Sequence, residues 1–349
     1  DYNNGFVFPG AVEQGMIAEI KPNGTLNVRA YSIDLKDYVE FSLDDEAGPK
    51  ATWARYIFGV CREMMALGVP VEGFNTAFAG DVPLGAGMSS SAALESTYAF
   101  ALNDLWGENK IEKMELARVG QRTEHKYVGC NCGIMDQFAS VFGRKGSLMR
   151  LDCRSGEYQY FPWNPKGYQL MLVNSCVKHE LAGSPYNERR LQCEHVAEII
   201  KETHPEVESL RDATREMLDE VQGKITGDEY KRARYVIGEV ERVLAVCDAL
   251  KHDDYEMVGK MMYETHYGLS KEYEVSCEEL DFLNDVAKEL GVTGSRIMGG
   301  GFGGCTINLV PDELVSNFKS TVVEKFAAKY GKKPIIIDVV IGDGSRKLL

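Results

Sequence analysis

The clearest pattern in the chain is a run of apolar side chains with helical spacing between residues 52 and 68. They recur every three or four positions, at Trp53, Tyr56, Ile57, Val60, Cys61 and Met64. This spacing puts them on one face of an amphipathic helix, and Gly68 is a typical residue for its end. The pattern therefore predicts a helix with one face against a core.

Short stretches rich in β-branched and aromatic residues predict strands on both sides of this helix. We expect these strands at residues 5–12, 15–20, 25–32, 38–43, 73–81, 147–152, 158–161 and 168–174. Lys21 to Gly24 (KPNG) form a turn sequence that predicts a hairpin between the second and third strands. Residues 334–342 (PIIIDVVIG) predict a buried strand.

Helical patterns dominate the second half of the chain. One predicted helix follows the fifth strand and ends at Leu105, and another covers residues 113–127. Most of residues 188–290 is predicted to be helical, including a helix over 277–290. Two short strands around a glycine cluster follow, and then a helix over residues 312–330. Mixed strands followed by a helix-rich half predict an α+β protein of two domains. We place the boundary near Pro165, Lys166 and Gly167, which gives domains over residues 1–165 and 166–349.

Composition and charge restrict the partners. The 349 residues include no stretch near the roughly 20 apolar residues of a membrane span. The net charge of −14 disfavours general nucleic-acid binding. Nine cysteines without a CxxC pair are typical of free thiols in a reducing cytoplasm. We therefore expect a cytoplasmic protein with no nucleic-acid or membrane partner, and, because the chain opens on Asp1 without an initiator Met, a further segment upstream.

The stretch PLGAGMSSSAALE, from Pro83 to Glu95, joins a predicted strand to a predicted helix. Its glycines let the backbone turn and approach a ligand closely. The unpaired N–H groups of a first helical turn, together with three serine hydroxyls, predict a site for phosphate. It is not a Walker A loop, because GxxxxGK[ST] is absent. A plain helix N-cap is the alternative, although one serine would suffice for that.

Five segments in order resemble the GHMP small-molecule kinases, and the galactokinases in particular. GDVPLGAGMSSSAALE is similar to their second signature, and DYNNGFVFPGAV at residues 1–12 to the end of the galactokinase sugar-binding signature. RIMGGGFGGCT at residues 296–306 is similar to the C-terminal glycine signature. CGIMDQFAS at 132–140 and SPYNERR at 184–190 resemble stretches specific to galactokinases.

This resemblance implies a fold and an activity. The N-terminal domain would resemble the second domain of ribosomal protein S5, and the C-terminal domain would be ferredoxin-like. The activity would be ATP-dependent phosphorylation of the anomeric hydroxyl of α-D-galactose to galactose 1-phosphate, the first committed step of galactose breakdown by the Leloir pathway. ATP and Mg²⁺ would be the cofactors, galactose and ATP the small-molecule substrates, and the protein a monomer.

The resemblance also implies roles for nucleotide-site residues. It assigns ATP binding to Gly85, Ala86, Gly87, Met88, Ser89, Ser90, Ser91, Ser32, Trp53 and Tyr56, and Mg²⁺ to Ser91 and Glu124. From the residues alone, Trp53 and Tyr56 equally fit a core face, and Glu124 is typical of a solvated helix acid. Met88 stands where leucine is usual, and Met298 where galactokinases usually carry threonine.

Sugar binding falls by resemblance to Asp1, Gly133, Asp136 and Tyr186, with Asp136 as the general base. A helix-surface aspartate and an ordinary interface tyrosine are the alternatives at Asp136 and Tyr186. The family's glutamate, histidine and threonine neighbours of Asp1, and its transition-state arginine, would precede Asp1.

Three other functions stay open. A related sugar-1-kinase for N-acetylgalactosamine, arabinose or galacturonate would share the nucleotide loop. A mevalonate-type kinase would share only the general signatures. A catalytically inactive galactose sensor would have the same fold but would lose residues from the serine–alanine segment, and the uninterrupted SSSAALE favours catalysis.

Overall fold

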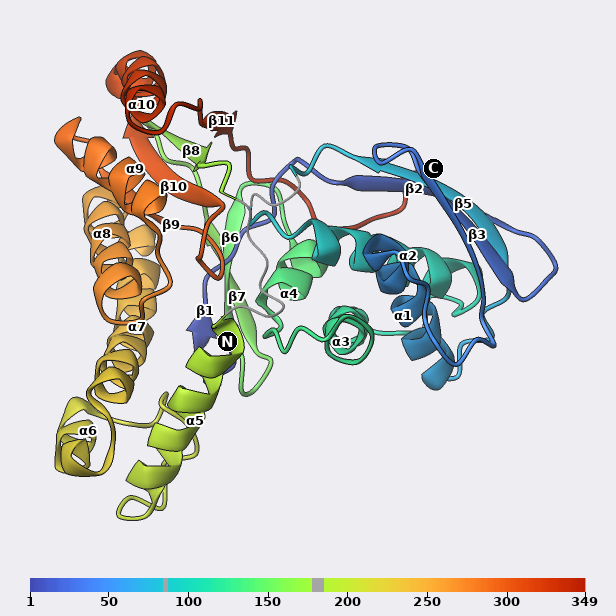
Figure 1. Cartoon of the computed structure of the whole chain (residues 1–349), viewed down its shortest axis with the longest axis horizontal. Helices are drawn as coiled ribbons and strands as arrows, with labels where there is room; N and C mark the ends of the chain where they lie inside the picture. Colours follow the sequence, from blue (N-terminus) through green and yellow to red (C-terminus); the bar gives the residue numbers. More distant parts are fainter. Residues whose placement is uncertain (84–86, 178–184, 349) are drawn as a thin grey trace. The chain divides into compact units, whose positions relative to one another are not determined.

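The computed structural model describes residues 1–83, 87–177 and 185–348, and the chain divides into two compact units (Figure 1). Unit 1 comprises residues 1–8, 84–88 and 146–340. Unit 2 comprises residues 9–83, 89–145 and 341–349. The domain boundary near residue 165 stays a prediction.

Unit 2 consists of a four-stranded sheet with helices on one face. The strands, in the spatial order β2-β5-β3-β4, are β2 (Met16–Pro22), β5 (Phe74–Gly80), β3 (Asn27–Ser32) and β4 (Asp37–Ser42). The helices are α1 (Thr52–Ala66), α2 (Ser90–Leu105), α3 (Lys113–Thr123) and α4 (Met135–Phe142). The apolar face of α1 is buried as predicted, and α1 and α2 pack side by side against the sheet (Figure 1). Ile57, Phe74 and Tyr98 lie at the centre of this core.

The predicted hairpin between β2 and β3 was wrong, because β5 lies between these strands. β5 pairs antiparallel with β2 and parallel with β3. The Asn23 N–H donates to the Gly73 carbonyl at 3.0 Å, and the Gly73 N–H donates to the Thr25 carbonyl at 2.8 Å. The turn thus holds the start of a strand that arrives later in the chain, which local turn chemistry cannot indicate.

The helix predicted over residues 113–127 is confirmed, but its last turn is wider than an α-helix. α3 continues into the π-helical turn η1 (Glu124–Val128), and Gly129 ends it with a φ of 86°. Such π-helical turns occur often at functional sites.

Unit 2 is completed by residues 341–348, which follow all of unit 1 in the chain. The Gly342 N–H donates to the Ala11 carbonyl at 2.9 Å, and the Ser345 N–H to the Ser140 carbonyl at 2.7 Å. Three chain segments therefore build this unit.

Unit 1 contains two sheets. The three-stranded sheet has the order β1 (Phe6–Val7), β6 (Ser147–Asp152), β7 (Tyr158–Pro162). The four-stranded sheet has the order β11 (Ile335–Asp338), β8 (Tyr168–Asn174), β10 (Cys305–Pro311), β9 (Gly294–Ile297). The predicted strands at 147–152, 158–161 and 168–174 are confirmed.

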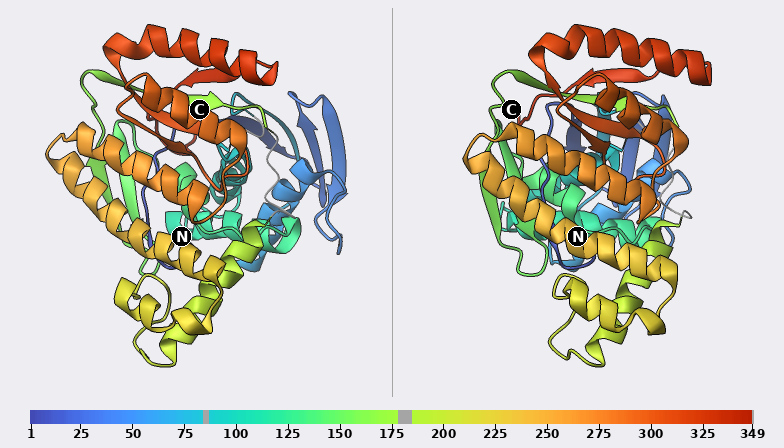
Figure 2. Two further views of the ribbon diagram at one scale, coloured as in Figure 1. Left: turned by 60° about the vertical axis from the view of Figure 1, so that its left-hand side comes forward. Right: turned by 90° about the vertical axis from the view of Figure 1, so that its left-hand side faces the viewer.

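The helices of unit 1 are α5 (Tyr186–Lys201), α6 (Arg215–Glu220), α7 (Gly227–Lys251), α8 (Tyr255–Lys271), α9 (Glu278–Glu289) and α10 (Val315–Tyr330), with short 3₁₀ turns at η2 (Gln222–Lys224) and η3 (Asp312–Leu314). α7 and α8 run side by side (Figure 2). α9 and α10 form a core with the four-stranded sheet through Leu283, Phe318, Phe326 and Met171.

The predicted C-terminal strand is present, but its predicted burial was wrong. β11 is an edge strand paired only with β8, and Ile335 is 53% exposed. An apolar run indicates a strand but does not distinguish an edge from the centre of a sheet.

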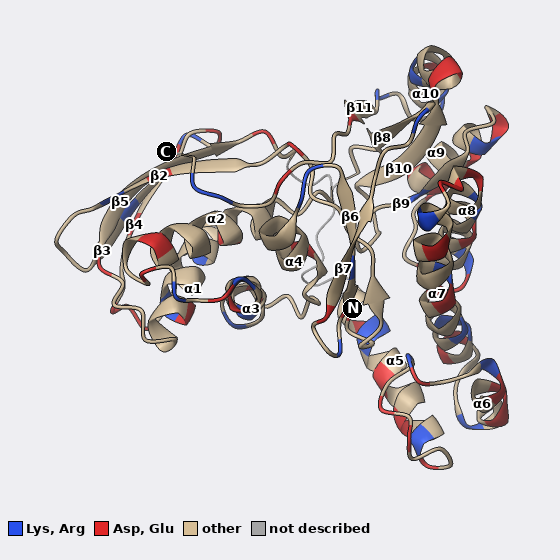
Figure 3. Ribbon diagram, turned by 180° about the vertical axis from the view of Figure 1, so that it is seen from behind, with Lys and Arg blue, Asp and Glu red and all other residues tan. Residues whose placement is uncertain are grey.

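Acidic and basic residues are interspersed along α7 and α8 (Figure 3). Some form pairs within unit 1, such as Arg234 with Glu272 at 2.8 Å and Arg242 with Glu239 at 2.7 Å. In the ranges that the structure describes, no helix has both the length and the apolar character needed to cross a membrane.

A glycine on α3 allows a close approach between helices. A Cβ at Gly120 would lie 2.8 Å from Gln137 Cγ and 3.0 Å from Glu95 Oε2. We expect Gly120→Ala to lower the free energy of unfolding by about 1–3 kcal/mol through overpacking, although alanine favours a helix by about 1 kcal/mol. Chemical denaturation measures this change.

Gly227→Ala is the matched control, because a Cβ at Gly227 in the first turn of α7 would have no described atom within 4 Å. This variant should be as stable as the wild type or slightly more so. Equal stability of the Gly120 and Gly227 variants would contradict the tight packing at α3.

Candidate active site

The start of α2 has an unusual conformation. Ser89, at the N-cap, has a φ of 57°, which is uncommon for a residue other than glycine. Its hydroxyl caps no backbone N–H among the described residues; it lies near Asp136, where it lowers the pKa of that carboxyl. The first N–H groups of α2, which begin at Ser90, are therefore not capped by this serine and can bind an anion.

Glu124 lies in the π-helical turn η1 and is only 7% exposed. Burial raises the pKa of its carboxyl to about 7, a hydrogen bond with Ser91 acts in the opposite direction, and the charge of Asp136 raises it further. The interpretation of Glu124 as a solvated helix acid was wrong. The predicted pair of Ser91 and Glu124 is brought together, and a hydroxyl with a carboxylate is a donor set that a hard cation such as Mg²⁺ prefers.

Asp136 lies in the first turn of α4 and is half-buried, so it is not an exposed helix-surface residue. Burial raises the pKa of its carboxyl, and the hydrogen bond with Ser89 lowers it. The predicted base thus lies near the first serine of the predicted phosphate-binding segment. Gly133, which is buried, precedes α4 in the same unit.

Glu95 is a site residue that the sequence analysis did not identify. It is 1% exposed on α2, and its Oε2 accepts a hydrogen bond from Gln137 Nε2 at 3.1 Å. Within the described part of the chain, its Oε1 and the Oε1 of Gln137 have no hydrogen-bond partner. Burial, then the charge of Glu124, raises the pKa of Glu95 well above its ordinary range. An acidic residue within the apolar run AALESTYAFA is the signal that could have indicated it.

Among the residues predicted to bind the adenine of ATP, Tyr56 lies beside the buried acids Glu95 and Glu124. Its phenol lies near Ser91, which lowers the pKa of the phenol slightly. Burial is the main cause that raises the pKa of Tyr56, and the charges of Glu124 and Glu95 add to it. Tyr56 also packs against the core of unit 2, so the core and ligand interpretations are compatible here.

Trp53 and Ser32 have partners within unit 2. The Trp53 ring packs against Phe78 with centroids 5.4 Å apart, and its Nε1–H donates to Asp37 at 2.8 Å. Ser32 is buried at the end of β3. Both predicted positions therefore serve the packing of the sheet, and their role toward adenine stays a prediction.

The glycine signature forms a tight turn in unit 1, with positive φ at Gly299, Gly301, Gly303 and Gly304. Gly87 has a φ of 75°, and a Cβ there would lie 3.6 Å from the Met298 carbonyl oxygen. The side chains of Met88 and Met298 pack against the same small cluster around Leu172 and Cys305. The glycine turn is thus in contact with the predicted phosphate loop at Gly87. Gly85 and Ala86 of this loop lie outside the described residues.

Asp1 and Tyr186, two predicted sugar ligands, are connected by Tyr2 in unit 1. The Tyr2 N–H donates to Asp1 Oδ1 at 2.8 Å. The Tyr2 and Tyr186 rings meet edge to face, with centroids 5.6 Å apart. Both predicted sugar ligands therefore contact the same residue, Tyr2.

Comparisons with known proteins agree with this geometry. The family model of the GHMP kinases N terminal domain matches residues 55–144, and that of the GHMP kinases C terminal matches residues 247–328. The chain is 36% identical to the galactokinase of Thermosipho africanus and 37% identical to that of Thermotoga maritima. Each match covers 100% of this chain and 95% of the relative.

Solved structures give the same result. The structure of Lactococcus lactis galactokinase complexed with galactose matches with a TM-score of 0.94 and 32% identity, over 100% of this chain and 91% of that one. The mevalonate kinase of Methanococcus jannaschii, with a TM-score of 0.61 and 17% identity over 97% of this chain and 92% of that one, shares the fold alone. The predicted two-domain α+β fold is confirmed. This chain belongs to the GHMP kinase family and, within it, to the galactokinases.

Proposed function

We propose that this protein transfers the γ-phosphoryl group of ATP to the anomeric hydroxyl of α-D-galactose, giving galactose 1-phosphate and ADP. The observation that carries the proposal is the likeness of the whole chain to galactokinases, together with Ser89 at the N-cap of α2 and Asp136 in the first turn of α4 of the same unit. Unit 2 thus contains both a carboxylate that can accept a proton and a helix terminus that can bind phosphate.

In this proposal Asp136 acts as the general base. It accepts the proton of the anomeric hydroxyl while that oxygen bonds to the γ-phosphorus and the bond to the β-phosphate oxygen breaks. Burial makes the carboxylate more basic, whereas the Ser89 hydrogen bond keeps it ionised. These opposing effects suit a base that works near neutral pH.

The nucleotide would bind along the loop from Gly85 to Ser91, with Ser32, Trp53 and Tyr56 toward the adenine. Mg²⁺ would be held by Ser91 and Glu124, and when bound it neutralises charge on the phosphates. The donor set fits a cation because burial, and to a smaller extent the charge of Asp136, raises the pKa of Glu124, and a bound cation would offset both effects.

Asp1, Gly133, Asp136 and Tyr186 stay the predicted sugar ligands, and we propose a monomer in the cytoplasm. The relatives described above are galactokinases, which favours galactose over N-acetylgalactosamine, arabinose and galacturonate. The intact serine–alanine segment favours an active enzyme over a sensor.

An assay of ADP release tests the function. The protein in its natural full length is given ATP and Mg²⁺ with galactose, glucose, N-acetylgalactosamine, arabinose, galacturonate or mevalonate, one at a time. Turnover with galactose alone supports the proposal. Turnover only with another substrate would replace galactose, and galactose binding without turnover would favour the sensor.

Asp136→Asn keeps the size of the side chain and removes its basicity. We expect kcat to fall about 10²–10⁴-fold, the usual contribution of a general base, with the Kd values for galactose and ATP little changed. Because burial raises the pKa of Asp136, kcat of the wild type should decline as the pH falls through that value. Steady-state kinetics and calorimetry measure both effects. Asp44→Asn, at an exposed position in the same unit, is the control, and a variant at Asp136 with near wild-type kcat would exclude it as the base.

Glu124→Gln should make the protein more stable at high pH in the absence of Mg²⁺, and should raise the Mg²⁺ concentration that activity requires. The folded protein holds a proton at Glu124 up to about pH 7, against 4.5 for a free glutamate. Without Mg²⁺ the wild type therefore loses stability as the pH rises through this window, and the glutamine variant does not. At pH 8 the variant should be more stable by about 1–3 kcal/mol, and nearly equal at pH 4.

The same variant should need more Mg²⁺ for activity, because a carboxylate ligand is replaced by a neutral amide. Thermal unfolding with and without Mg²⁺ and a Mg²⁺ titration of the rate make the two measurements. Glu112→Gln changes an exposed acid before α3 and serves as the control. An unchanged Mg²⁺ titration would remove Glu124 from the metal site.

A further inference from the structure

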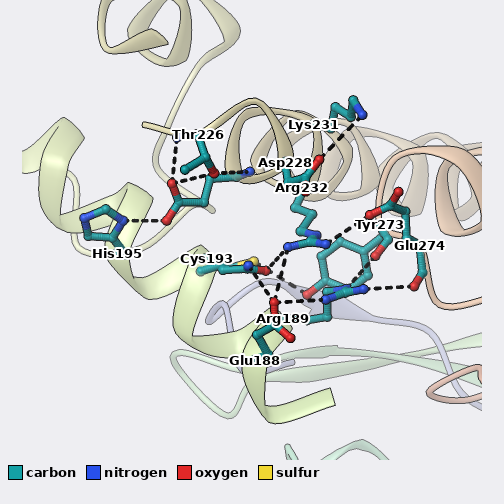
Figure 4. A network of polar contacts seen from close by, with 12 residues as sticks. Glu188, Arg189, Cys193, His195, Thr226, Asp228, Lys231, Arg232, Tyr273 and Glu274 are labelled. Carbon is teal, nitrogen blue, oxygen red and sulfur yellow. Dashed lines mark hydrogen bonds and ion pairs between the residues drawn. The ribbon is translucent and has the colours of Figure 1, made fainter. Parts of the chain in front are cut away.

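The loop between α8 and α9, residues 272–277, makes two contacts within unit 1 that matter here. One is with Tyr2, which lies against the predicted sugar residues Asp1 and Tyr186, and the other is with the glycine turn. Figure 4 shows the polar network around this loop, including Tyr273 and Glu274.

Tyr273 reaches the sugar residues through Tyr2. The two phenol oxygens share a short hydrogen bond. Tyr2 in turn donates its N–H to the Asp1 carboxylate at 2.8 Å and packs edge to face on the Tyr186 ring. One tyrosine thus contacts both predicted ligands, and its hydroxyl is held by Tyr273.

Two buried arginines fix the loop itself. Arg189 Nε donates to the Tyr273 carbonyl at 2.8 Å, and its Nη2 donates to the Glu274 carbonyl at 3.2 Å. Arg232, on α7, donates from Nη2 to Glu274 Oε2 at 3.0 Å (Figure 4). Hydrogen bonds from charged groups in buried surroundings are among the stronger ones in proteins.

These contacts form a closed ring. Arg189 lies one helical turn after Tyr186 on α5, so the same helix carries a predicted sugar ligand and the arginine that binds the Tyr273 backbone. The ring then runs from Tyr273 through Tyr2 back to Tyr186. A displacement of Tyr273 would therefore move Tyr2 and, with it, the two predicted sugar ligands Asp1 and Tyr186.

The glycine turn touches a different part of the loop. The Phe302 N–H donates to the Val275 carbonyl at 2.6 Å, and a Cβ at Gly301 would lie 2.1 Å from that oxygen. The contact to the glycine turn uses backbone atoms of Val275, whereas the contact to Tyr2 uses the Tyr273 hydroxyl. A change of the hydroxyl alone should therefore affect the sugar and spare the nucleotide.

We propose that Tyr273 is a positioning residue that holds Tyr2, and through it Asp1 and Tyr186, in the arrangement that binds the sugar. This inference rests on the proposed function. The loop backbone, fixed by Arg189 and Arg232, supplies the rigid support. Burial raises the pKa of both phenols above the ordinary value, so their hydrogen bond is a neutral one at physiological pH.

Tyr273→Phe tests the proposal, because it removes the hydroxyl and keeps the ring in the core. We expect KM for galactose to rise about threefold to tenfold, the usual effect of losing the hydrogen bond to Tyr2. The contact of the Tyr273 hydroxyl with the buried Cys193 Sγ at 3.5 Å is lost as well, but it leads away from the predicted sugar residues. KM for ATP should change by less than about twofold, and calorimetry should show the same rise in the Kd of galactose. If Tyr273 served stability alone, the ratio of the KM for galactose to the KM for ATP would be the same in the variant as in the wild type.

Tyr2→Phe removes the other half of the same hydrogen bond and should have the same effect. The double variant should then be no worse than Tyr273→Phe alone, because the hydrogen bond between the two phenols is already absent from that variant. If Tyr273→Phe proves unstable, Tyr2→Phe alone makes the measurement.

Tyr230→Phe is the matched control, since this tyrosine of the same unit donates its hydroxyl to Asp219 at 2.6 Å, away from the ring of contacts. It should leave both KM values unchanged. An unchanged KM for galactose in the Tyr273 and Tyr2 variants, or a parallel rise of both KM values, would overturn the proposal. Wild-type turnover of galactose tests the proposed function separately, and if another sugar replaces galactose, the same variants are measured with that sugar.

Discussion

The burial of three acidic side chains, Glu95, Glu124 and Asp136, is the constraint that the polar groups around them in unit 2 must satisfy. Each of these carboxyls has its pKa raised by burial; the charges of Glu124 and Asp136 raise the pKa of Glu95 further, and the charge of Asp136 raises that of Glu124. Buried acids of like charge destabilise a fold unless partners compensate them. Here Gln137 donates a hydrogen bond to Glu95, and the hydroxyls of Ser91 and Ser89 lower the pKa values of Glu124 and Asp136.

The helices bring the three acids together by packing unusually closely. Gly120 lets α3 approach both α2 and α4, because a side chain there would meet Glu95 and Gln137. The π-helical turn that follows α3 carries Glu124. A glycine contact and a widened turn are thus local departures from ideal helices that serve the same cluster, as expected where function competes with stability.

Sequence patterns predicted much of the fold and the ligand-binding motifs. The periodicity around Ile57 and Val60 located α1, and the serine-rich segment located the start of α2. The burial of Glu124 could not be predicted, because it depends on how α3 packs against other helices and leaves no local pattern. The same holds for Glu95, whose partner Gln137 lies on a different helix.

The order of the strands in the sheet of unit 2 could not be predicted from the sequence either, and this order has a consequence for synthesis on the ribosome. Because β5 separates β2 from β3, the first strands cannot complete their sheet as a local hairpin when they emerge. Residues 341–348, which contact Ala11 and Ser140, emerge only after all of unit 1. Unit 2 therefore reaches its final form after unit 1 has been translated, so its partly built core must stay soluble until then. Such non-local assembly slows folding and prolongs the exposure of apolar surface, which makes unit 2 the part of the molecule that would benefit most from a chaperone during translation.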